Sequence, residues 1–288
     1  MTELSAGLID VFAEKPLSGN PLAVVEGADA LSEADMRRIA GEFNQAETTF
    51  LLKSDRADRR LRSFTAAGAE VTGAGHNALG AWLWLAEHGA LGPLATPQTF
   101  HQEIGDEVLP LVLARVAGRI QGRMRQAPPR LLPPLDDITP LARALGLLPG
   151  DILATPAPRP VGFHLLVRLR DAAAIDRARP ANEPLHDILR AAGAEGCYIY
   201  AHDLAASQKA YARFFNPAVG LWEDAATGTA AGPLAAYLSS AGLLQAGTLA
   251  VEQGVKMGRR SIINIKVTPD PEISGAGIVV FRGVLRVA

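Results

Sequence analysis

An internal repeat constrains the fold of this chain more than any other feature of its sequence. When the sequence is aligned with itself, Gly75 falls on Gly228, and the agreement continues on both sides. The further pairs matched at the same offset are Glu70 with Glu223, Ala78 with Ala231, Leu85 with Leu238, Gly89 with Gly242 and Leu91 with Leu244. When the offset is shortened by two residues, Arg62 also matches Arg213 and Phe64 matches Phe215. Each half therefore has an Arg-x-Phe strand, a loop, a glycine-containing turn and an apolar helix that ends at glycine. We predict two similar lobes that arose by duplication.

The helix after each glycine turn is apolar on nearly every side, as residues 78–86 illustrate. Such a helix is surrounded by other elements rather than lying on a surface. Another helix is expected to begin at the capping residue Ser32, and a proline-rich stretch over 127–134 suits a crossover between the lobes. Short apolar or alternating runs predict strands at 8–12, 22–25, 48–52, 60–64, 161–169, 196–201, 212–215, 261–267 and 277–287, and further helices are expected near 138–147 and 185–192.

Length and charge limit the class of protein. At ~150 residues per domain, a length of 288 residues predicts two domains or one large one, and the repeat favours two. With 28 basic against 30 acidic side chains, the chain lacks the basic surface of a nucleic-acid binder. Its single cysteine, Cys197, excludes a disulfide framework and is interpreted as a small buried hydrophobe. No signal peptide or membrane-spanning run is visible, so we expect a cytoplasmic protein without nucleic-acid or membrane partners.

Two turns in the sequence could bind an anion. Residues 73–77 and 226–230 place small residues directly before an apolar helix, where unpaired N–H groups and the helix dipole favour negative charge. A cleft between two lobes would bring both turns to one site for a small carboxylate. Alternatively, the glycines only let the helices pack tightly. The spacing of Gly73 and Gly75 also resembles a dinucleotide fingerprint, but the acidic residue expected ~20 positions further on is absent.

Glu47 is the candidate proton-transfer group. It lies where a helix gives way to an apolar strand, and partial burial there would raise its pKa toward the range of a general acid or base. The alternative is an edge-strand glutamate that faces solvent. Extending the alignment of the repeat places Tyr198 opposite Glu47, so the acid belongs to one half alone.

Two further polar residues flank the glycine turns. At the start of the first apolar helix, His76 would be kept neutral by the positive helix end and act as a hydrogen-bond partner; an exposed helix cap is the alternative. Asp224 precedes the second turn, where it could instead be a capping or loop carboxylate. The remaining histidines do not have the spacing of a metal site, so no metal is expected.

These motifs together resemble the signature of the phenazine-biosynthesis isomerase, or PhzF-like, family. The motifs are Asp10-Val11-Phe12, Gly19-Asn20-Pro21-Leu22-Ala23-Val24-Val25, Glu47-Thr48-Thr49-Phe50-Leu51, Ala74-Gly75-His76 and Glu223-Asp224-Ala225-Ala226-Thr227-Gly228-Thr229-Ala230. The resemblance implies a diaminopimelate-epimerase-like α+β fold with two pseudo-symmetric lobes. Each lobe would be a curved, mostly antiparallel, barrel-like sheet around a central helix. We expect the lobes to comprise residues 1–122 with 281–288, and residues 123–280.

The resemblance also implies an activity and a site. In the phenazine isomerase, a glutamate matching Glu47 moves a proton between two carbons of dihydro-hydroxyanthranilate, acting as general acid and base in the cleft between the lobes. Residues matching His76 and Asp224 contact the substrate, and amides at the glycine turns hold its carboxylate. The substrate-binding residues expected on this basis also include Gly75, Gly228, Thr229 and Asn20. The resemblance implies no cofactor or metal, and it implies a homodimer.

The chain departs from the family pattern around the predicted cleft. Ala74 and Thr227 stand where the epimerase has its two cysteines, which excludes racemisation by two thiols. Asn77 and Ala225 stand where the family usually has prolines, and the segment 65–68 also lacks a proline. These differences leave the identity of the substrate open. We therefore expect an isomerase that shifts a proton on a small carboxylic acid. The alternatives are a non-catalytic small-molecule binding protein and an epimerase or racemase that uses no thiol.

Overall fold

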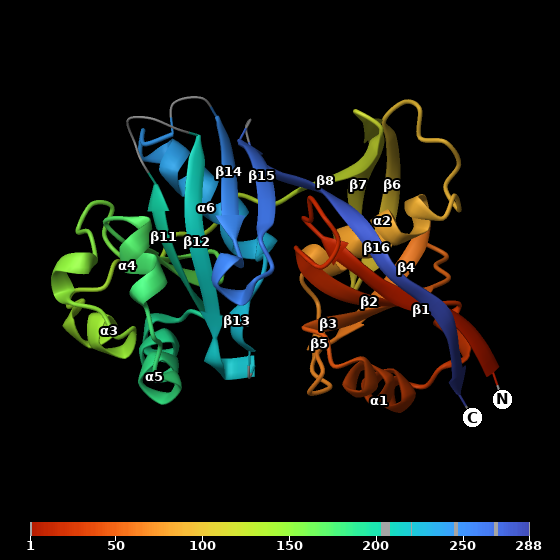
Figure 1. Cartoon of the computed structure of the whole chain (residues 1–288), viewed down its shortest axis with the longest axis horizontal. Helices are drawn as coiled ribbons and strands as arrows, with labels where there is room; N and C mark the ends of the chain where they lie inside the picture. The colour runs from red at the N-terminus through yellow and green to blue at the C-terminus, as the bar shows by residue number, and fades with distance from the viewer. Residues whose placement is uncertain (1, 203–207, 220, 245–246, 268–269, 288) are drawn as a thin grey trace. The chain divides into compact units, whose positions relative to one another are not determined.

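The computed structural model describes residues 2–202, 208–219, 221–244, 247–267 and 270–287. The chain divides into two compact units (Figure 1). Unit 1 comprises Met1–Arg125 and Ser274–Ala288, and unit 2 comprises Gln126–Ile273. One strand, β16 (Pro271–Val287), begins in unit 2 and continues into unit 1.

The described strands of unit 1 form a closed barrel. They run in the order β1-β2-β3-β4-β6-β7-β8-β16, and β16 pairs antiparallel with β1, so that Thr2 lies opposite Val287. Most neighbouring pairs are antiparallel, whereas β2 with β3 and β4 with β6 are parallel. The bounds are β1 Thr2–Val11, β2 Asn20–Glu26, β3 Glu47–Leu52, β4 Arg59–Phe64, β5 Glu70–Val71 (paired with β4), β6 Gln98–Ile104, β7 Glu107–Val116 and β8 Arg119–Arg125. The predicted fold class is confirmed.

The central helix of unit 1 is α2 (His76–Glu87). It contacts β1, β2, β3 and β8, and every residue from His76 to Ala86 is buried, as the all-round apolar sequence predicts. Gly80 lets the helix approach the sheet closely. A Cβ at this position would lie 2.6 Å from side-chain atoms of both Leu22 and Val11.

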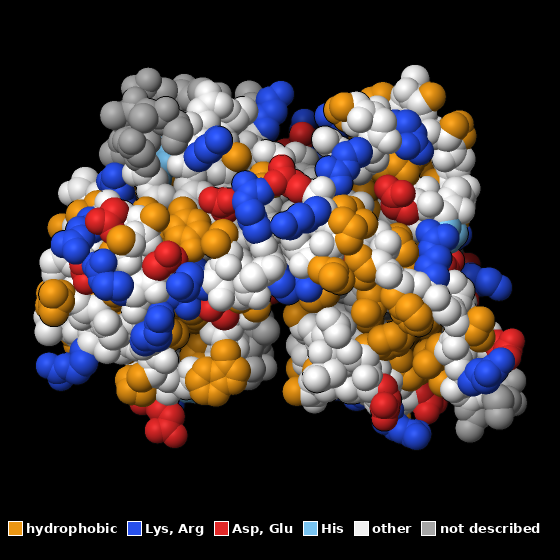
Figure 2. Space-filling view, viewed as in Figure 1, with side chains coloured by type: hydrophobic (Ala, Val, Ile, Leu, Met, Phe, Trp, Pro, Cys, Tyr) orange, Lys and Arg blue, Asp and Glu red, His pale blue; other side chains and the backbone are white. Residues whose placement is uncertain are grey.

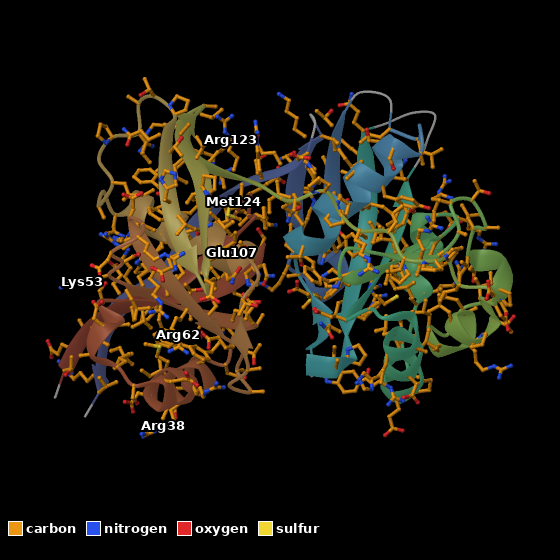
Figure 3. The ribbon with its side chains drawn as sticks, turned by 180° about the vertical axis from the view of Figure 1, so that it is seen from behind. Arg38, Lys53, Arg62, Glu107, Arg123 and Met124 are labelled. Atoms are coloured by element: carbon orange, nitrogen blue, oxygen red, sulfur yellow. The ribbon has the colours of Figure 1, made fainter. Side chains whose placement is uncertain are left out.

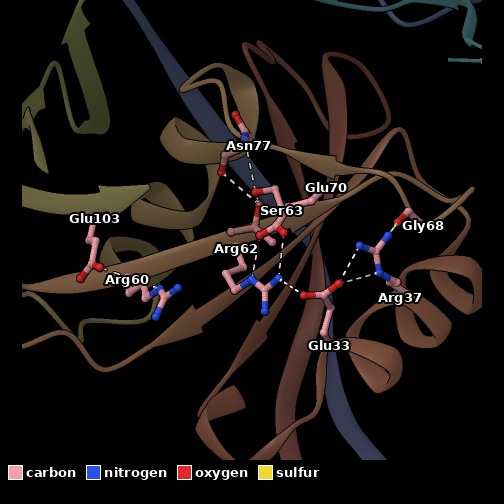
Figure 4. A network of polar contacts seen from close by, with 10 residues as sticks. Glu33, Arg37, Arg60, Arg62, Ser63, Gly68, Glu70, Asn77 and Glu103 are labelled. Atoms are coloured by element: carbon pink, nitrogen blue, oxygen red, sulfur yellow. Dashed lines mark hydrogen bonds and ion pairs between the residues drawn. The ribbon is translucent and has the colours of Figure 1, made fainter. Parts of the chain in front are cut away.

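The helix α1 (Glu33–Phe43) packs on β3 and β4. It begins at the predicted cap, because the Ser32 hydroxyl accepts a hydrogen bond of 3.1 Å from the amide of Asp35. Its polar face is tied to β4 through Glu33, which accepts hydrogen bonds from Arg37 and Arg62 (Figure 4). Its apolar face joins a core cluster that includes Met36, Ile39, Ala40, Phe50 and Phe64.

Unit 2 repeats this plan with additional helices. Its strands follow the order β15-β14-β12-β11-β10-β9, with β13 paired to β12, and its central helix α6 (Gly228–Ser240) contacts β9, β10, β14 and β15. The strand bounds are β9 Arg159–Val161, β10 His164–Arg168, β11 Gly196–His202, β12 Lys209–Asn216, β13 Leu221–Asp224, β14 Thr248–Gln253 and β15 Ser261–Val267. A separate cluster of apolar side chains packs the helices α3 (Thr139–Ala144), α4 (Ala172–Arg177) and α5 (Asn182–Ala192) onto this sheet.

Equivalent side chains make equivalent contacts in the two units, which supports the predicted duplication. Arg62 forms a two-pronged ion pair with Glu70, with both N–O distances 2.7 Å. Arg213 does the same with Glu223, with both distances 2.8 Å. Both pairs link neighbouring strands, β4 with β5 and β12 with β13. The matched glycines Gly89 and Gly242 also both follow their helix in a left-handed conformation.

Strand register corrects one detail of the predicted repeat. In unit 1, Phe50 of β3 lies opposite Arg62, and in unit 2 the residue opposite Arg213 is Ile199 of β11. Counting back along the two strands places Gly196, not Tyr198, at the position of Glu47. The shift arises because Arg62 follows Phe50 by 12 positions whereas Arg213 follows Ile199 by 14, so the repeat alignment needs a further gap between the paired strands. The conclusion that unit 2 lacks the acid is unchanged.

Other elements differ from the sequence-based expectations. The strand expected over 161–169 is a hairpin of β9 and β10, because Gly162 adopts a left-handed conformation (φ 65°) between them. The helix α4 and the strands β5 to β8, β13 and β14 were not predicted. On β8, exposed and buried residues alternate, as Arg123 and Met124 (labelled in Figure 3) illustrate with one side chain exposed and the other buried.

The outer surface of unit 1 carries apolar side chains on β16. Figure 2 shows hydrophobic atoms over the part of the molecule where β16 and β1 lie in Figure 1. Phe281 and Val284 are the exposed large hydrophobic residues of this strand. Between them, the Arg282 guanidinium lies 5.1 Å from the centre of the Trp84 ring. In the part of the chain that the structure describes, no helix has the length and hydropathy needed to span a bilayer.

Candidate active site

Glu47 and His76 lie together at one end of the unit 1 barrel. Glu47 is the first residue of β3, and His76 is the first residue of α2, which packs on β3. Glu47 Oε2 is 3.9 Å from His76 Nε2, and the two side chains are 18% and 8% exposed. Glu47 therefore does not face bulk solvent, and His76 is not an exposed helix cap.

Burial governs the charge of His76. Removal from water lowers the pKa of this imidazole to about 4, so His76 is neutral at pH 7. The positive end of α2 disfavours the cation in the same direction. Among the described residues, His76 Nε2 has no hydrogen-bond partner. A ring nitrogen of this kind is available to a polar atom of a bound molecule.

Asn77 holds the turn that precedes α2. Its Oδ1 accepts the N–H of Gly75 at 2.8 Å, and its Nδ2 donates to the carbonyl of Gly73 at 3.0 Å. The same Nδ2 donates to Ser63 Oγ at 3.2 Å, and the Ser63 hydroxyl shares a hydrogen bond of 2.8 Å with that of Thr49 (Figure 4). A proline at this position would fix the backbone directly, whereas Asn77 fixes it through its side chain.

The hydrogen bond from Gly75 to Asn77 bears on the predicted role of Gly75. One N–H would have to serve both the Asn77 oxygen and a substrate carboxylate. The following amides, of His76, Asn77 and Ala78, lie in the first turn of α2 and have no acceptor within the helix. These three amides are therefore better placed than that of Gly75 to bind an anion.

Asn20 lies at the same end of the barrel as Glu47. It is the first residue of β2, and the parallel pairing of β2 with β3 places Leu22 opposite Glu47. Asn20 is 1% exposed, so its polar groups are withdrawn from bulk water. Its predicted role in substrate binding remains a prediction.

In unit 2, a buried hydrogen-bond network surrounds the start of α6. The Thr227 hydroxyl donates to Asp224 Oδ2 at 2.6 Å, and the Thr227 amide donates to Gln253 Oε1 at 3.2 Å. Gln253 Nε2 donates to the Asp224 carbonyl at 2.8 Å, and the Tyr198 hydroxyl donates to Gln253 Oε1 at 2.9 Å. Asp224 is 6% exposed, and the network fixes its position at the end of β13.

Gly228 and Thr229 form the first turn of α6. The amides of Ala230 and Ala231 donate to the Thr227 carbonyl, at 3.1 and 3.0 Å, so the helical pattern begins there. The amides of Gly228 and Thr229 precede these bonds and have no acceptor within the helix. The first turn of α6 therefore presents amide donors of the kind that hold carboxylates.

Sequence reasoning did not identify Gln253 or the cap formed by Asn77. Gln253 lies at the end of a strand and is entirely buried, but its partners lie far away in the sequence. The one signal that could have pointed to Asn77 was its place directly after His76, in a turn of small residues.

Thiol and metal chemistry find no support in the described residues. Burial raises the pKa of Cys197 to about 12, so its thiol is protonated and unreactive at neutral pH. Among the residues that the structure describes, no group of three or more His, Cys, Asp or Glu side chains is arranged to hold a metal ion.

Comparison with known proteins identifies the family. The family model described as phenazine biosynthesis-like protein matches residues 9–283. The chain belongs to this family. It is 33% identical over 293 residues to trans-2,3-dihydro-3-hydroxyanthranilate isomerase of Pseudomonas chlororaphis, with 96% of the chain and 98% of that protein covered. The relatives that match nearly the whole chain are named isomerases, and this chain is an isomerase.

Solved structures agree with this family and with the fold. The crystal structure of a phenazine biosynthesis protein of the PhzF family from Bacillus anthracis superposes with a TM-score of 0.87 at 25% identity, with 100% of both chains covered. A hydroxyproline epimerase from Agrobacterium vitis superposes with a TM-score of 0.64 at 10% identity, covering 98% of this chain and 92% of that one. The second likeness shows a shared fold alone, and it agrees with the predicted diaminopimelate-epimerase-like architecture.

Proposed function

We propose that this isomerase shifts a proton between two carbons of a small carboxylic acid, without a cofactor, and that Glu47 is its general acid and base. The observation that carries the proposal is the half-buried Glu47 carboxylate, which lies 3.9 Å from a neutral, buried His76. The relative named trans-2,3-dihydro-3-hydroxyanthranilate isomerase, at 33% identity over 293 residues, makes an acid of that class the first substrate to test.

The proposed reaction conserves every atom of the substrate. The Glu47 carboxylate removes a proton from an sp³ carbon, and the electrons of that C–H bond enter the adjoining π system. The double bond moves, and the Glu47 carboxylic acid gives a proton to a different carbon of that system. When this carboxylic acid exchanges with solvent before it gives up its proton, D₂O labels the product at that carbon. Proton transfer by a positioned group contributes ~10²–10⁴-fold to the rate, so substrate orientation must supply much of the remainder.

The neutral state of His76 suits this role for Glu47. A histidine whose pKa is lowered to about 4 is neutral at pH 7, so it does not form an ion pair with the Glu47 carboxylate. Its Nε2, which has no hydrogen-bond partner among the described residues, can instead position a polar group of the substrate. Asp224, Gly228 and Thr229 remain proposed substrate contacts of unit 2, where the amides at the start of α6 would hold a carboxylate.

Deuterium incorporation tests the proposal directly. The wild-type protein is incubated with trans-2,3-dihydro-3-hydroxyanthranilate in D₂O, and conversion and label are followed by NMR. A panel of other small carboxylic acids follows if this compound is not converted. We expect Glu47→Gln to fold normally and to lose at least ~10²-fold in rate. Glu42→Gln is the matched control, because Glu42 is an exposed residue of α1.

The outcomes separate the candidate functions. Near wild-type turnover by Glu47→Gln would remove Glu47 from the proposed role. Binding of a ligand with neither conversion nor deuterium exchange would indicate a binding protein. Inversion of a chiral carbon with deuterium incorporation, but without movement of a double bond, would indicate an epimerase.

A further inference from the structure

His164 occupies a position in unit 2 that has no polar equivalent in unit 1. It is the first residue of β10 and lies opposite Gly196 of the parallel strand β11. The matching pair in unit 1 is Leu22 opposite Glu47. In unit 1 the polar residue of this pair is Glu47, on the second strand, whereas in unit 2 it is His164, on the first strand.

The ring of Phe214 fills the space beside Gly196. A Cβ on Gly196 would lie 2.3 Å from the Phe214 ring, so a larger residue at the position that Glu47 occupies in unit 1 would have to displace that ring. The Phe214 and His164 rings pack in a T-shaped arrangement, with the ring centres 4.8 Å apart. His164 is 4% exposed and is held between this ring and the start of α6.

One hydrogen bond joins His164 to the first turn of α6. His164 Nε2 lies 3.1 Å from Thr229 Oγ1, while His164 Nδ1 has no hydrogen-bond partner among the described residues. Burial lowers the pKa of His164 to about 4, so the ring is neutral at pH 7 and only one of its nitrogens carries a hydrogen.

The environment of the two nitrogens selects the tautomer. A hydrogen on Nδ1 would be a buried donor without an acceptor, which costs more free energy than a buried acceptor without a donor. A hydrogen on Nε2 has an acceptor at 3.1 Å in Thr229 Oγ1 and leaves on Nδ1 only an unused lone pair. The Nε2–H tautomer is therefore favoured, with His164 as the donor and Thr229 as the acceptor.

We propose that His164 is a positioning residue, which donates its Nε2–H to Thr229 Oγ1 and so directs the Thr229 hydroxyl hydrogen away from the ring toward an acceptor of the bound substrate. Thr229 is half-buried, and among the described residues its hydroxyl has no hydrogen bond other than the one with His164. The hydroxyl would then join the amides of Gly228 and Thr229 as a third donor. The ligand chemistry that matches is an anionic oxygen, such as that of a carboxylate.

The claim that Thr229 donates to the substrate rests on the proposed function, whereas the claim about the His164 tautomer does not. Separate experiments test the two claims. In the first experiment, the protein is labelled with ¹⁵N-histidine, and long-range ¹H–¹⁵N spectra are recorded at pH 7.5. The His164 signals are assigned by their loss in His164→Gln. We expect the neutral Nε2–H tautomer. An Nδ1–H tautomer or an imidazolium would overturn the inference, whatever the protein catalyses.

The second experiment measures kcat and KM with trans-2,3-dihydro-3-hydroxyanthranilate, or with the acid that the panel identifies. Loss of the donor in His164→Leu should lower kcat/KM about tenfold, mainly through KM, because one hydrogen bond to an anion is weakened. His164→Gln, whose amide nitrogen can take the place of Nε2, should recover most of that loss. His186→Leu changes an exposed histidine of α5 and is the control for unit 2.

A double-mutant cycle separates positioning from a general loss of structure. In a Thr229→Val background, His164→Leu should have little further effect on kcat/KM, because the hydroxyl that it directs is gone. An equal loss in both backgrounds would overturn the inference, as would full activity of His164→Leu. Thermal unfolding of each variant checks that it is folded. A wild-type protein that converts none of the acids would count against the proposed function, and the spectra would still decide the tautomer.

Discussion

Removal of the Asn77 side chain should destabilise unit 1 by an amount that can be worked out from its contacts. Asn77 is 3% exposed and makes three hydrogen bonds, with the Gly75 amide, the Gly73 carbonyl and Ser63 Oγ. Asn77→Ala removes all three and leaves the Gly75 N–H without its partner. With ~1 kcal/mol for each of the two bonds to the Gly73 carbonyl and Ser63, and ~1–3 kcal/mol for the orphaned Gly75 N–H, we expect a loss of about 3–5 kcal/mol in the free energy of unfolding.

The assay is urea unfolding followed by circular dichroism, with stability taken from the linear dependence on denaturant. Ser63→Ala is the matched variant, because it shares one bond with Asn77, the contact of 3.2 Å. A double-mutant cycle between the two should give a coupling of about 1 kcal/mol. A loss below ~0.5 kcal/mol for Asn77→Ala would refute the argument that its side chain holds the turn.

Three further predictions concern stability. Burial lowers the pKa of His76 from its usual 6.5 to about 4, so between these pH values the unfolded state binds a proton that the folded state does not. The free energy of unfolding should therefore fall by up to ~1.4 kcal/mol per pH unit as the pH drops from 6.5 to 4. Urea denaturation of His76→Gln across this range should show a weaker dependence of stability on pH. Gly196→Ala should cost ~1–3 kcal/mol through overpacking, and Phe214→Leu should relieve part of that cost in melting experiments. Glu223→Gln should lower the urea midpoint more than Glu70→Gln, because its ion pair is less exposed, and equal shifts would contradict this.

The parts of the fold that could be predicted from the sequence are those with local signals. The repeated glycine turns and the all-round apolar stretches predicted both central helices, and Ser32 predicted the start of α1. The family motifs then predicted the meeting of Glu47 with His76. In each case the residues that fix the structure lie close together in the sequence, or belong to a recognisable pattern.

The parts that were missed depend on partners far away in the sequence. Gln253 meets the turn before α6 because β14 returns beside it, and no pattern around Gln253 indicates that contact. The alignment places Tyr198 opposite Glu47 because it has no gap between the paired positions of the two strands, where unit 2 has two more residues. Strand pairing identifies Gly196 instead. The contact of His164 with Thr229 likewise joins two segments that only the folded chain brings together.

The path of β16 sets an order for folding during synthesis. The unit 1 barrel is complete only when residues 274–287 reach β1, yet the ribosome makes these residues after the whole of unit 2. At about 5–20 residues per second, the roughly 150 intervening residues take on the order of ten to thirty seconds to translate. Throughout that interval the nascent first unit has an unpaired edge on β1, the kind of edge that recruits foreign strands. Unit 2 can thus finish its fold first, and protection of the β1 edge by a chaperone would matter most while unit 2 emerges.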